Sequence, residues 1–128
     1  ALANKKHGRI TININGDGDL NYAPGVLWTA VHHQIPLLTI VHNNRAYHQE
    51  LMYLQQQAAA RNRGVNRAAI GTTITDPDID YAQMARSYGM YAQGPIEHPN
   101  DLGPALRQGV ERIKAGEPAL IDIVTQPR

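Results

Sequence analysis

Cysteine is absent from this sequence, which excludes disulfide bonds, thiolate catalysis and cysteine-based zinc sites. Phenylalanine is absent too, so Tyr and a single Trp supply all the aromatic side chains. The formal net charge of +1 lacks the basic excess of dedicated nucleic-acid-binding proteins, so we expect no nucleic-acid partner. No apolar run approaches the roughly 18 residues of a membrane span, and residues 1–9 lack the apolar segment of a signal peptide. We therefore expect no membrane contact, and a cytoplasmic location is the default.

What the sequence does contain is the composition of one soluble globular domain. Its 128 residues are 42% hydrophobic and 18% charged, which is enough apolar material to bury a core. The first residues, Ala1 to Lys5, are typical of the last turn of a helix. We therefore expect residues 1–128 to form a single domain that is a fragment of a longer, multidomain chain.

Apolar strand-like runs alternate with segments of helical periodicity along the chain. The predicted strands are residues 9–15, 35–42, 90–94 and 118–125. The predicted helices are residues 22–34, 46–60, 78–88 and 99–115. Residues 61–78 are rich in Gly, Asn, Thr and Pro and predict a long loop, which is uncommon in a compact domain unless it is functional or mobile. The alternation predicts an α/β fold, with a parallel sheet covered by helices on both faces.

Two polar motifs follow the first two predicted strands. Gly16-Asp17-Gly18 ends the first strand and Asn43-Asn44 ends the second, with residues 19–42 between them. Each motif alone is a common turn sequence, but the carboxyl ends of parallel strands are where an open α/β sheet binds its ligand. The pair therefore favours a binding site over two unrelated turns.

The residue types in these motifs indicate a metal and a phosphate. Gly16 and Gly18 lack the Cβ atoms that would keep a phosphate from the backbone. Asp17 would repel a bare phosphate, so its presence makes sense if Mg²⁺ lies between them, since Mg²⁺ prefers oxygen ligands. Asn44 can add a carboxamide oxygen, and a backbone carbonyl just beyond it a third ligand.

These residues carry a specific resemblance to a known family. The segments 16–22, 27–30, 35–36 and 43–47 closely resemble the thiamin-diphosphate motif, and the similarity extends to the closing strand at residues 117–123. The group it resembles contains benzoylformate decarboxylase, pyruvate decarboxylase and acetohydroxyacid synthase. The resemblance covers about the whole chain and implies the diphosphate-binding domain of that family. It also implies a three-layer α/β/α sandwich with a mostly parallel sheet.

The resemblance implies roles for individual side chains and backbone groups. Mg²⁺ would be bound by the side chains of Asp17 and Asn44 and by the backbone carbonyl of Ala46. The backbone N–H groups of Gly18 and Asp19 would bind the diphosphate of thiamin diphosphate. Tyr47 would also contact the diphosphate, and Asn43 would fix the turn. The implied cofactor-binding residues are Gly16, Gly18, Asp19, Asn43 and Tyr47.

Two positions depart from the family pattern. A second carboxylate at Asp19 is unfavourable beside a diphosphate, so we expect it to cap the helix that follows. The stretch from His48 to Leu51 differs from the family at the place where relatives line the substrate pocket. The resemblance therefore does not identify the substrate. Within it, His48 is the candidate catalytic residue, able to donate a hydrogen bond or move a proton. The basic middle segment, with Arg45, Arg61, Arg63 and Arg67, is either a solvated face and loop or a mobile lid.

The implied function is that of an enzyme acting on 2-oxo acids, by decarboxylation, by carboligation of the acetohydroxyacid synthase type, or both. The expected ligands are thiamin diphosphate, Mg²⁺ and a 2-oxo acid or aldehyde. The expected partners are a pyrimidine-binding domain and identical subunits, in a homodimer or homotetramer. One alternative is a nucleotide-binding α/β domain, although position 21 is Asn where Gly-x-Gly-x-x-Gly needs its third Gly. Another is a non-catalytic scaffold of the same fold.

Overall fold

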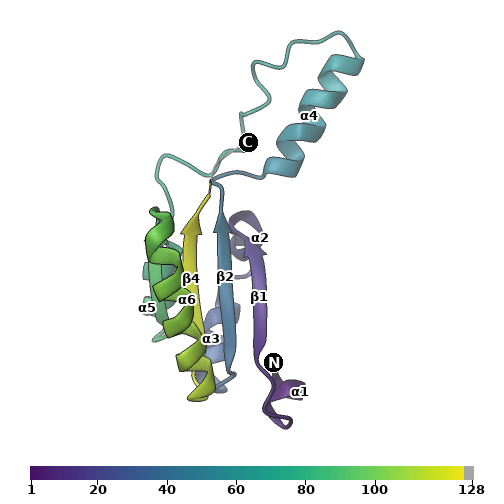
Figure 1. Ribbon diagram of the computed structural model, residues 1–128. Helices are drawn as coiled ribbons and strands as arrows, with labels where there is room; N and C mark the ends of the chain where they lie inside the picture. The colour runs from purple at the N-terminus through teal and green to yellow at the C-terminus, as the bar shows by residue number, and fades with distance from the viewer. Residues whose placement is uncertain (126–128) are drawn as a thin grey trace.

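A four-stranded, entirely parallel sheet forms the centre of the molecule (Figure 1). The structure is a computed structural model that describes residues 1–125. The strands lie in the order β1-β2-β4-β3. Their bounds are β1 Thr11–Gly16, β2 Leu37–Asn43, β3 Tyr91–Ile96 and β4 Ala119–Val124. Residues 119–122 of β4 are buried, as expected for a central strand with both faces covered.

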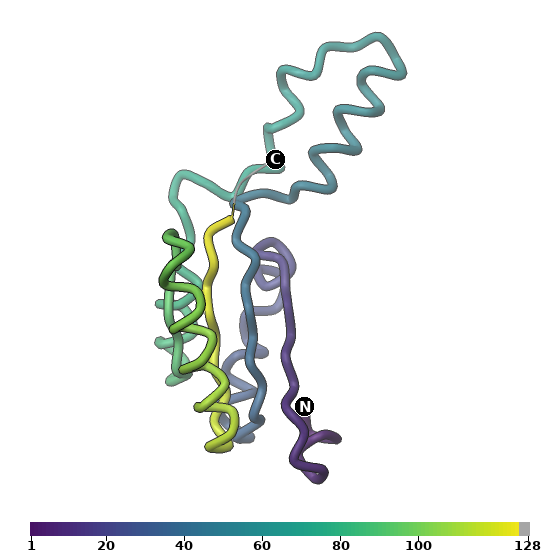
Figure 2. Tube along the Cα trace, viewed as in Figure 1, coloured from purple at the N-terminus to yellow at the C-terminus, as the bar shows by residue number. Residues whose placement is uncertain are grey.

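Helices cover both faces of the sheet, which confirms the predicted three-layer α/β fold (Figures 1 and 2). One face carries α2, α3 and α5, whose Leu20, Leu27 and Tyr81 share a core with Val41 and Leu120 of the sheet. The other face carries α6, which packs on β2 and β4. The bounds are α1 Leu2–Lys5, α2 Asp17–Tyr22, α3 Gly25–His32, α4 His48–Ala60, α5 Tyr81–Ser87 and α6 Pro99–Lys114. No described helix is both long and apolar enough to cross a membrane.

The helix predicted over residues 22–34 corresponds to α3, and a separate short helix that was not predicted precedes it. This short helix, α2, begins at Asp17 directly after β1, and α3 begins at Gly25. Ala23 between them has φ −149° and ψ 58°, which is outside the helical region, and Pro24 follows it. A residue before proline is disfavoured in the helical conformation, which accounts for the break.

The expected capping role of Asp19 is wrong. The residue that caps α2 is Gly16, and no side chain provides a capping hydrogen bond. Asp19 lies inside the first turn of α2, because α2 begins at Asp17, five residues before the predicted helix start at residue 22. Its carboxylate folds back toward Gly16, with Oδ2 3.1 Å from where a Cβ of that glycine would be. The negative charge of Asp19 in the first turn still stabilises α2 through its interaction with the helix dipole.

One part of the chain stands away from the sheet. We call residues 48–75 the arm; they comprise α4 and the predicted long loop, which contains no further helix or strand (Figure 2). No residue of α4 is buried. The base of the arm is closed by two backbone hydrogen bonds, from Tyr47 N to Thr72 O at 2.7 Å and from Ile74 N to Arg45 O at 2.7 Å. The arm therefore leaves and rejoins the body at the end of β2.

Candidate functional site

The two polar motifs meet at the carboxyl end of the sheet. β1 and β2 are parallel neighbours, and Gly16 lies opposite His42, so the residues that follow each strand emerge side by side. Between them lies a hollow of about 220 Å³. Of the residues assigned to the site from the sequence, all except Asn43 line this hollow: Gly16, Asp17, Gly18, Asp19, Asn44, Ala46, Tyr47 and His48.

Asp17 provides a buried carboxylate with one free oxygen. The residue is 2% exposed, and its Oδ1 accepts a hydrogen bond from Gly18 N at 2.8 Å. Its Oδ2 is buried and has no hydrogen-bond partner among residues 1–125. A buried carboxylate oxygen without a partner is costly, and a metal ion is one of the few ligands that satisfies it. The Asp17 side chain therefore fits a cation bound at the hollow.

Asn44 and Ala46 add neutral oxygens to the same place. Asn44 Oδ1 accepts a hydrogen bond from Ala46 N at 3.0 Å, which fixes the turn between them. A carboxamide oxygen has a second lone pair that remains available for a metal. Among residues 1–125, no group of three or more His, Cys, Asp or Glu side chains converges as a metal site. A site here would thus combine one carboxylate with neutral oxygens, a donor set that suits Mg²⁺.

Gly18 is required by the packing of Tyr47. A Cβ at position 18 would lie 2.5 Å from Cε1 and 2.6 Å from Cδ1 of the Tyr47 ring. The ring also stands near Tyr22, with 6.1 Å between ring centroids. Tyr47 therefore lies directly over the glycine turn, at the wall of the hollow.

His48 is the first residue of α4, and its ring carries two unsatisfied nitrogens. Both Nδ1 and Nε2 are buried, and neither has a hydrogen-bond partner among the described residues. Because a neutral imidazole has one donor and one acceptor nitrogen, it can still offer both functions to a ligand in the hollow. The neighbouring Glu50 is exposed and also lines the hollow.

Comparison with known proteins identifies the family. Residues 1–123 match the family described as thiamine pyrophosphate enzyme, C-terminal TPP binding domain. The chain belongs to this family. Thiamine pyrophosphate is thiamin diphosphate, so the predicted family is confirmed.

Individual relatives of this thiamine-pyrophosphate-binding domain are enzymes of known type. It is 29% identical to benzoylformate decarboxylase of Pseudomonas aeruginosa over 118 residues, which cover 92% of this chain and 20% of the relative. It is 32% identical to acetolactate synthase of Bacillus subtilis over 119 residues, which cover 92% of this chain and 18% of the relative. A solved structure, the thiamine diphosphate-dependent 4-hydroxybenzoylformate decarboxylase of Rhodococcus jostii, superposes with a TM-score of 0.68 at 28% identity and covers 92% of this chain and 20% of that one. The chain spans about a fifth of the length of the relatives it matches.

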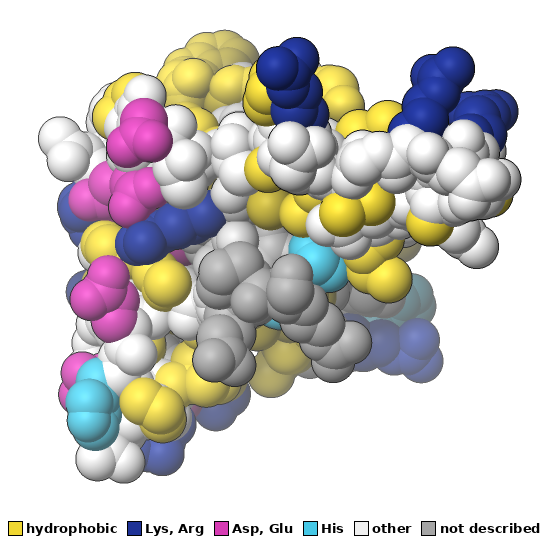
Figure 3. Space-filling model, turned by 90° about the horizontal axis from the view of Figure 1, so that it is seen from above, with side chains coloured by type: hydrophobic (Ala, Val, Ile, Leu, Met, Phe, Trp, Pro, Cys, Tyr) yellow, Lys and Arg dark blue, Asp and Glu magenta, His cyan; other side chains and the backbone are white. Residues whose placement is uncertain are grey.

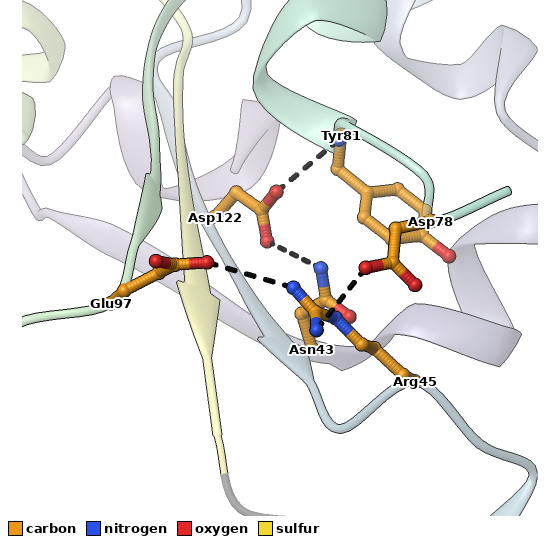
Figure 4. A network of polar contacts seen from close by, with 6 residues as sticks. All are labelled: Asn43, Arg45, Asp78, Tyr81, Glu97 and Asp122. Carbon is orange, nitrogen blue, oxygen red and sulfur yellow. Dashed lines mark hydrogen bonds and ion pairs between the residues drawn. The ribbon is translucent and has the colours of Figure 1, made fainter. Parts of the chain in front are cut away.

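Asn43 lies outside the hollow of this thiamine-pyrophosphate-binding domain. The residue is 4% exposed, and its Nδ2 donates to Asp122 Oδ1 at 3.1 Å (Figure 4). The carboxamide is thus directed toward β4 and supports the end of β2, which agrees with a turn-fixing role. A direct contact between Asn43 and the cofactor stays an untested prediction.

Asp122 and Tyr81 are site-supporting residues that sequence reasoning missed. Asp122 is fully buried on β4 and also accepts a hydrogen bond from Tyr81 N, at 3.2 Å to Oδ2 (Figure 4). Burial raises the pKa of the Asp122 carboxyl above its ordinary value, while the bonds from Asn43 and Tyr81 lower it in part. A lone carboxylate in the apolar run of residues 119–124 is a signal that could have marked it.

Arg45 holds the surrounding loops together at the same end. Its guanidinium pairs with Asp78 at 3.1 Å and with Glu97 at 3.6 Å (Figure 4). Figure 3 views the molecule from this end, and its Lys and Arg side chains stand apart rather than merging into one basic patch. Arg61, Arg63 and Arg67 of the arm are exposed. The lid interpretation of the arm stays a prediction.

Proposed function

We propose that this domain binds Mg²⁺ through Asp17, Asn44 and the carbonyl of Ala46, and through Mg²⁺ the diphosphate of thiamin diphosphate. The observation that carries this proposal is the Asp17 Oδ2 atom, which is buried beside the hollow and has no hydrogen-bond partner in the described part of the chain. Mg²⁺ commonly combines one or two carboxylates with phosphate oxygens and water, so a single aspartate with neutral oxygens is sufficient. The family match supports the cofactor.

The backbone of the Gly16–Asp19 turn is proposed to receive the diphosphate. The N–H groups of Gly18 and Asp19 lie in the first turn of α2, where backbone donors lack partners within the helix. Gly18 N donates to Asp17 in the structure, and this bond would be shared or exchanged when phosphate oxygens arrive. The Tyr47 ring would form one side of the diphosphate site.

The proposed reaction is decarboxylation of a 2-oxo acid, carboligation of its product with a second carbonyl compound, or both. When bound, thiamin diphosphate supplies the stabilisation of negative charge at the carbonyl carbon that this chemistry needs. His48 would donate a hydrogen bond to the substrate or move a proton there. The names of the relatives, a decarboxylase and an acetolactate synthase, support this class of lyase or transferase. We propose that catalysis also needs a pyrimidine-binding domain in a cytoplasmic homodimer or homotetramer.

The experiment is a measurement of CO₂ release from a panel of 2-oxo acids, including pyruvate and benzoylformate. The intact protein that carries this domain would be assayed with thiamin diphosphate and Mg²⁺. We expect release with at least one acid and at least a hundredfold lower rate in Asp17→Asn, whereas Asp101→Asn, at an exposed aspartate of α6 outside the hollow, keeps the rate. Full cofactor binding without turnover of any acid, alone or with an aldehyde acceptor, would contradict the enzymatic proposal and indicate a binding scaffold.

A further inference from the structure

A buried tyrosine contacts the backbone of the predicted metal ligand. Tyr81 is the first residue of α5 and is fully buried. Its hydroxyl donates to the backbone carbonyl of Asp17 at 3.2 Å. The same hydroxyl accepts a hydrogen bond from Asn21 Nδ2 at 3.0 Å. Tyr81 therefore holds α2 at its first residue and again one turn later.

The other end of Tyr81 is tied to the second motif. Its backbone N–H donates to Asp122 Oδ2, and Asn43 Nδ2 donates to Asp122 Oδ1. Asn43 is bonded covalently to Asn44, the second predicted ligand. A chain of buried hydrogen bonds thus joins Asp17 to the residue before Asn44, through α5 and β4. Figure 4 shows its part from Tyr81 through Asp122 to Asn43.

Packing alone does not account for the hydroxyl. The Tyr81 ring lies in an apolar cluster with Leu20, Leu27, Val41 and Leu120, where a phenylalanine ring would fill almost the same volume. Burying a hydroxyl without a hydrogen-bond partner costs free energy. The Tyr81 hydroxyl is therefore explained by its hydrogen bonds and not by the apolar side chains around the ring. Those hydrogen bonds are with Asp17 and Asn21.

We propose that Tyr81 is a positioning residue, whose hydroxyl fixes the Asp17 backbone and thereby sets the separation of the Asp17 and Asn44 oxygens for Mg²⁺. Groups behind the ligands commonly orient them and tune metal affinity. Mg²⁺ tolerates little departure from octahedral geometry, so a small displacement of one ligand weakens binding. This inference rests on the proposed role of Asp17 and Asn44 as Mg²⁺ ligands.

The test compares Tyr81→Phe with Tyr91→Phe in the intact protein. Tyr91 is the matched control, since its hydroxyl bonds to Gln108 at 2.9 Å on the exposed side of β3 and α6, outside the hollow. Retention of thiamin diphosphate after rapid gel filtration would be measured over a series of Mg²⁺ concentrations. We expect Tyr81→Phe to raise the half-saturating Mg²⁺ concentration about tenfold, because it removes the hydrogen bond that holds the Asp17 carbonyl, and Tyr91→Phe to leave it unchanged.

Each outcome bears on one proposal. If the wild-type protein retains no thiamin diphosphate at any Mg²⁺ concentration, the proposed function fails. If it does retain the cofactor and Tyr81→Phe has the same half-saturation, the inference alone is overturned, even where the melting temperature of the variant falls. Should Tyr81→Phe not fold, Asp122→Asn replaces it, because its single carbonyl oxygen must serve two donors. It is expected to shift the Mg²⁺ midpoint in the same direction, and an unchanged midpoint would overturn the inference.

Discussion

At Gly18, an added Cβ would lie 2.5 Å from the Tyr47 ring, a separation that real Cβ atoms do not reach. The sequence predicted this glycine as a place of close phosphate approach. The structure adds that a neighbouring aromatic ring already needs the same space. Tyr47 is only half-buried, so the ring rather than the backbone would yield to a larger residue.

Gly18→Ala is expected to weaken cofactor binding more than it weakens the fold. The displaced Tyr47 ring would no longer line the hollow, and we expect a loss of about tenfold in thiamin diphosphate affinity, equivalent to about 1.4 kcal/mol. Gly25→Ala is the control, because a Cβ there meets nothing within 4 Å. Calorimetric titration at saturating Mg²⁺ measures both. Equal affinities for the two variants would show that the Tyr47 contact has no bearing on the cofactor.

Asp122 makes the stability of the chain depend on pH. Its pKa is raised by burial above the ordinary 3.8, so the folded chain holds this proton more tightly than the unfolded chain. Stability from this group is then fully present below pH 3.8 and is lost as pH rises through the raised pKa. We expect the free energy of unfolding of the wild type, minus that of Asp122→Asn, to fall as pH rises from about 4. Urea unfolding over a pH series measures it, and a difference that grows with pH would refute the assignment.

Residues close to the motifs were predictable from sequence, and residues acting from a distance were not. Asp17, Gly18 and Asn44 follow strands directly, so their position at the sheet edge follows from the fold class. Tyr81 is 64 residues from the Asp17 carbonyl that it contacts. No local pattern encodes such a pair, since it depends on where α5 packs against the sheet.

At the scale of elements, periodicity predicted the strands and most helices to within a few residues. It failed at residues 17–21, where a turn was expected and the structure forms most of α2. The turn after β1 is itself the start of α2, and Pro24 then separates α2 from α3. Turn residues thus concealed a short helix, because Gly and Asp are poor helix formers in isolation.

Two helical glycines offer a contrast. At Gly109 of α6 an added Cβ would lie 2.8 Å from Leu38 Cδ1, inside the core, whereas at Gly25 of α3 an added Cβ meets no described atom within 4 Å. We expect Gly25→Ala to stabilise the chain by about 0.5–1 kcal/mol through helix propensity. Gly109→Ala should destabilise it by about 1–3 kcal/mol through overpacking. Chemical denaturation of both variants measures the two effects, and the same sign for both would contradict the packing of α6 on β2.

At the scale of the whole molecule, the site exists because two parallel strands lie side by side. The alternation of elements predicted the parallel sheet, but nothing in the sequence gives the order β1-β2-β4-β3. The arm could be predicted only as a helix followed by a long loop, because its position depends on two backbone hydrogen bonds at its base. Substrate, subunits and partner domains are properties of the whole protein. This chain spans about a fifth of the length of the relatives it matches.

The central claim is that Asp17 holds Mg²⁺ and, with it, thiamin diphosphate. The most direct measurement is the cofactor and metal content of the intact protein, loaded with both and desalted, for the wild type and Asp17→Asn. We predict about one Mg²⁺ and one thiamin diphosphate per chain in the wild type and near loss of both in the variant, with its circular dichroism unchanged. Equal retention by the variant, or no retention by the wild type at saturating Mg²⁺, would contradict the claim.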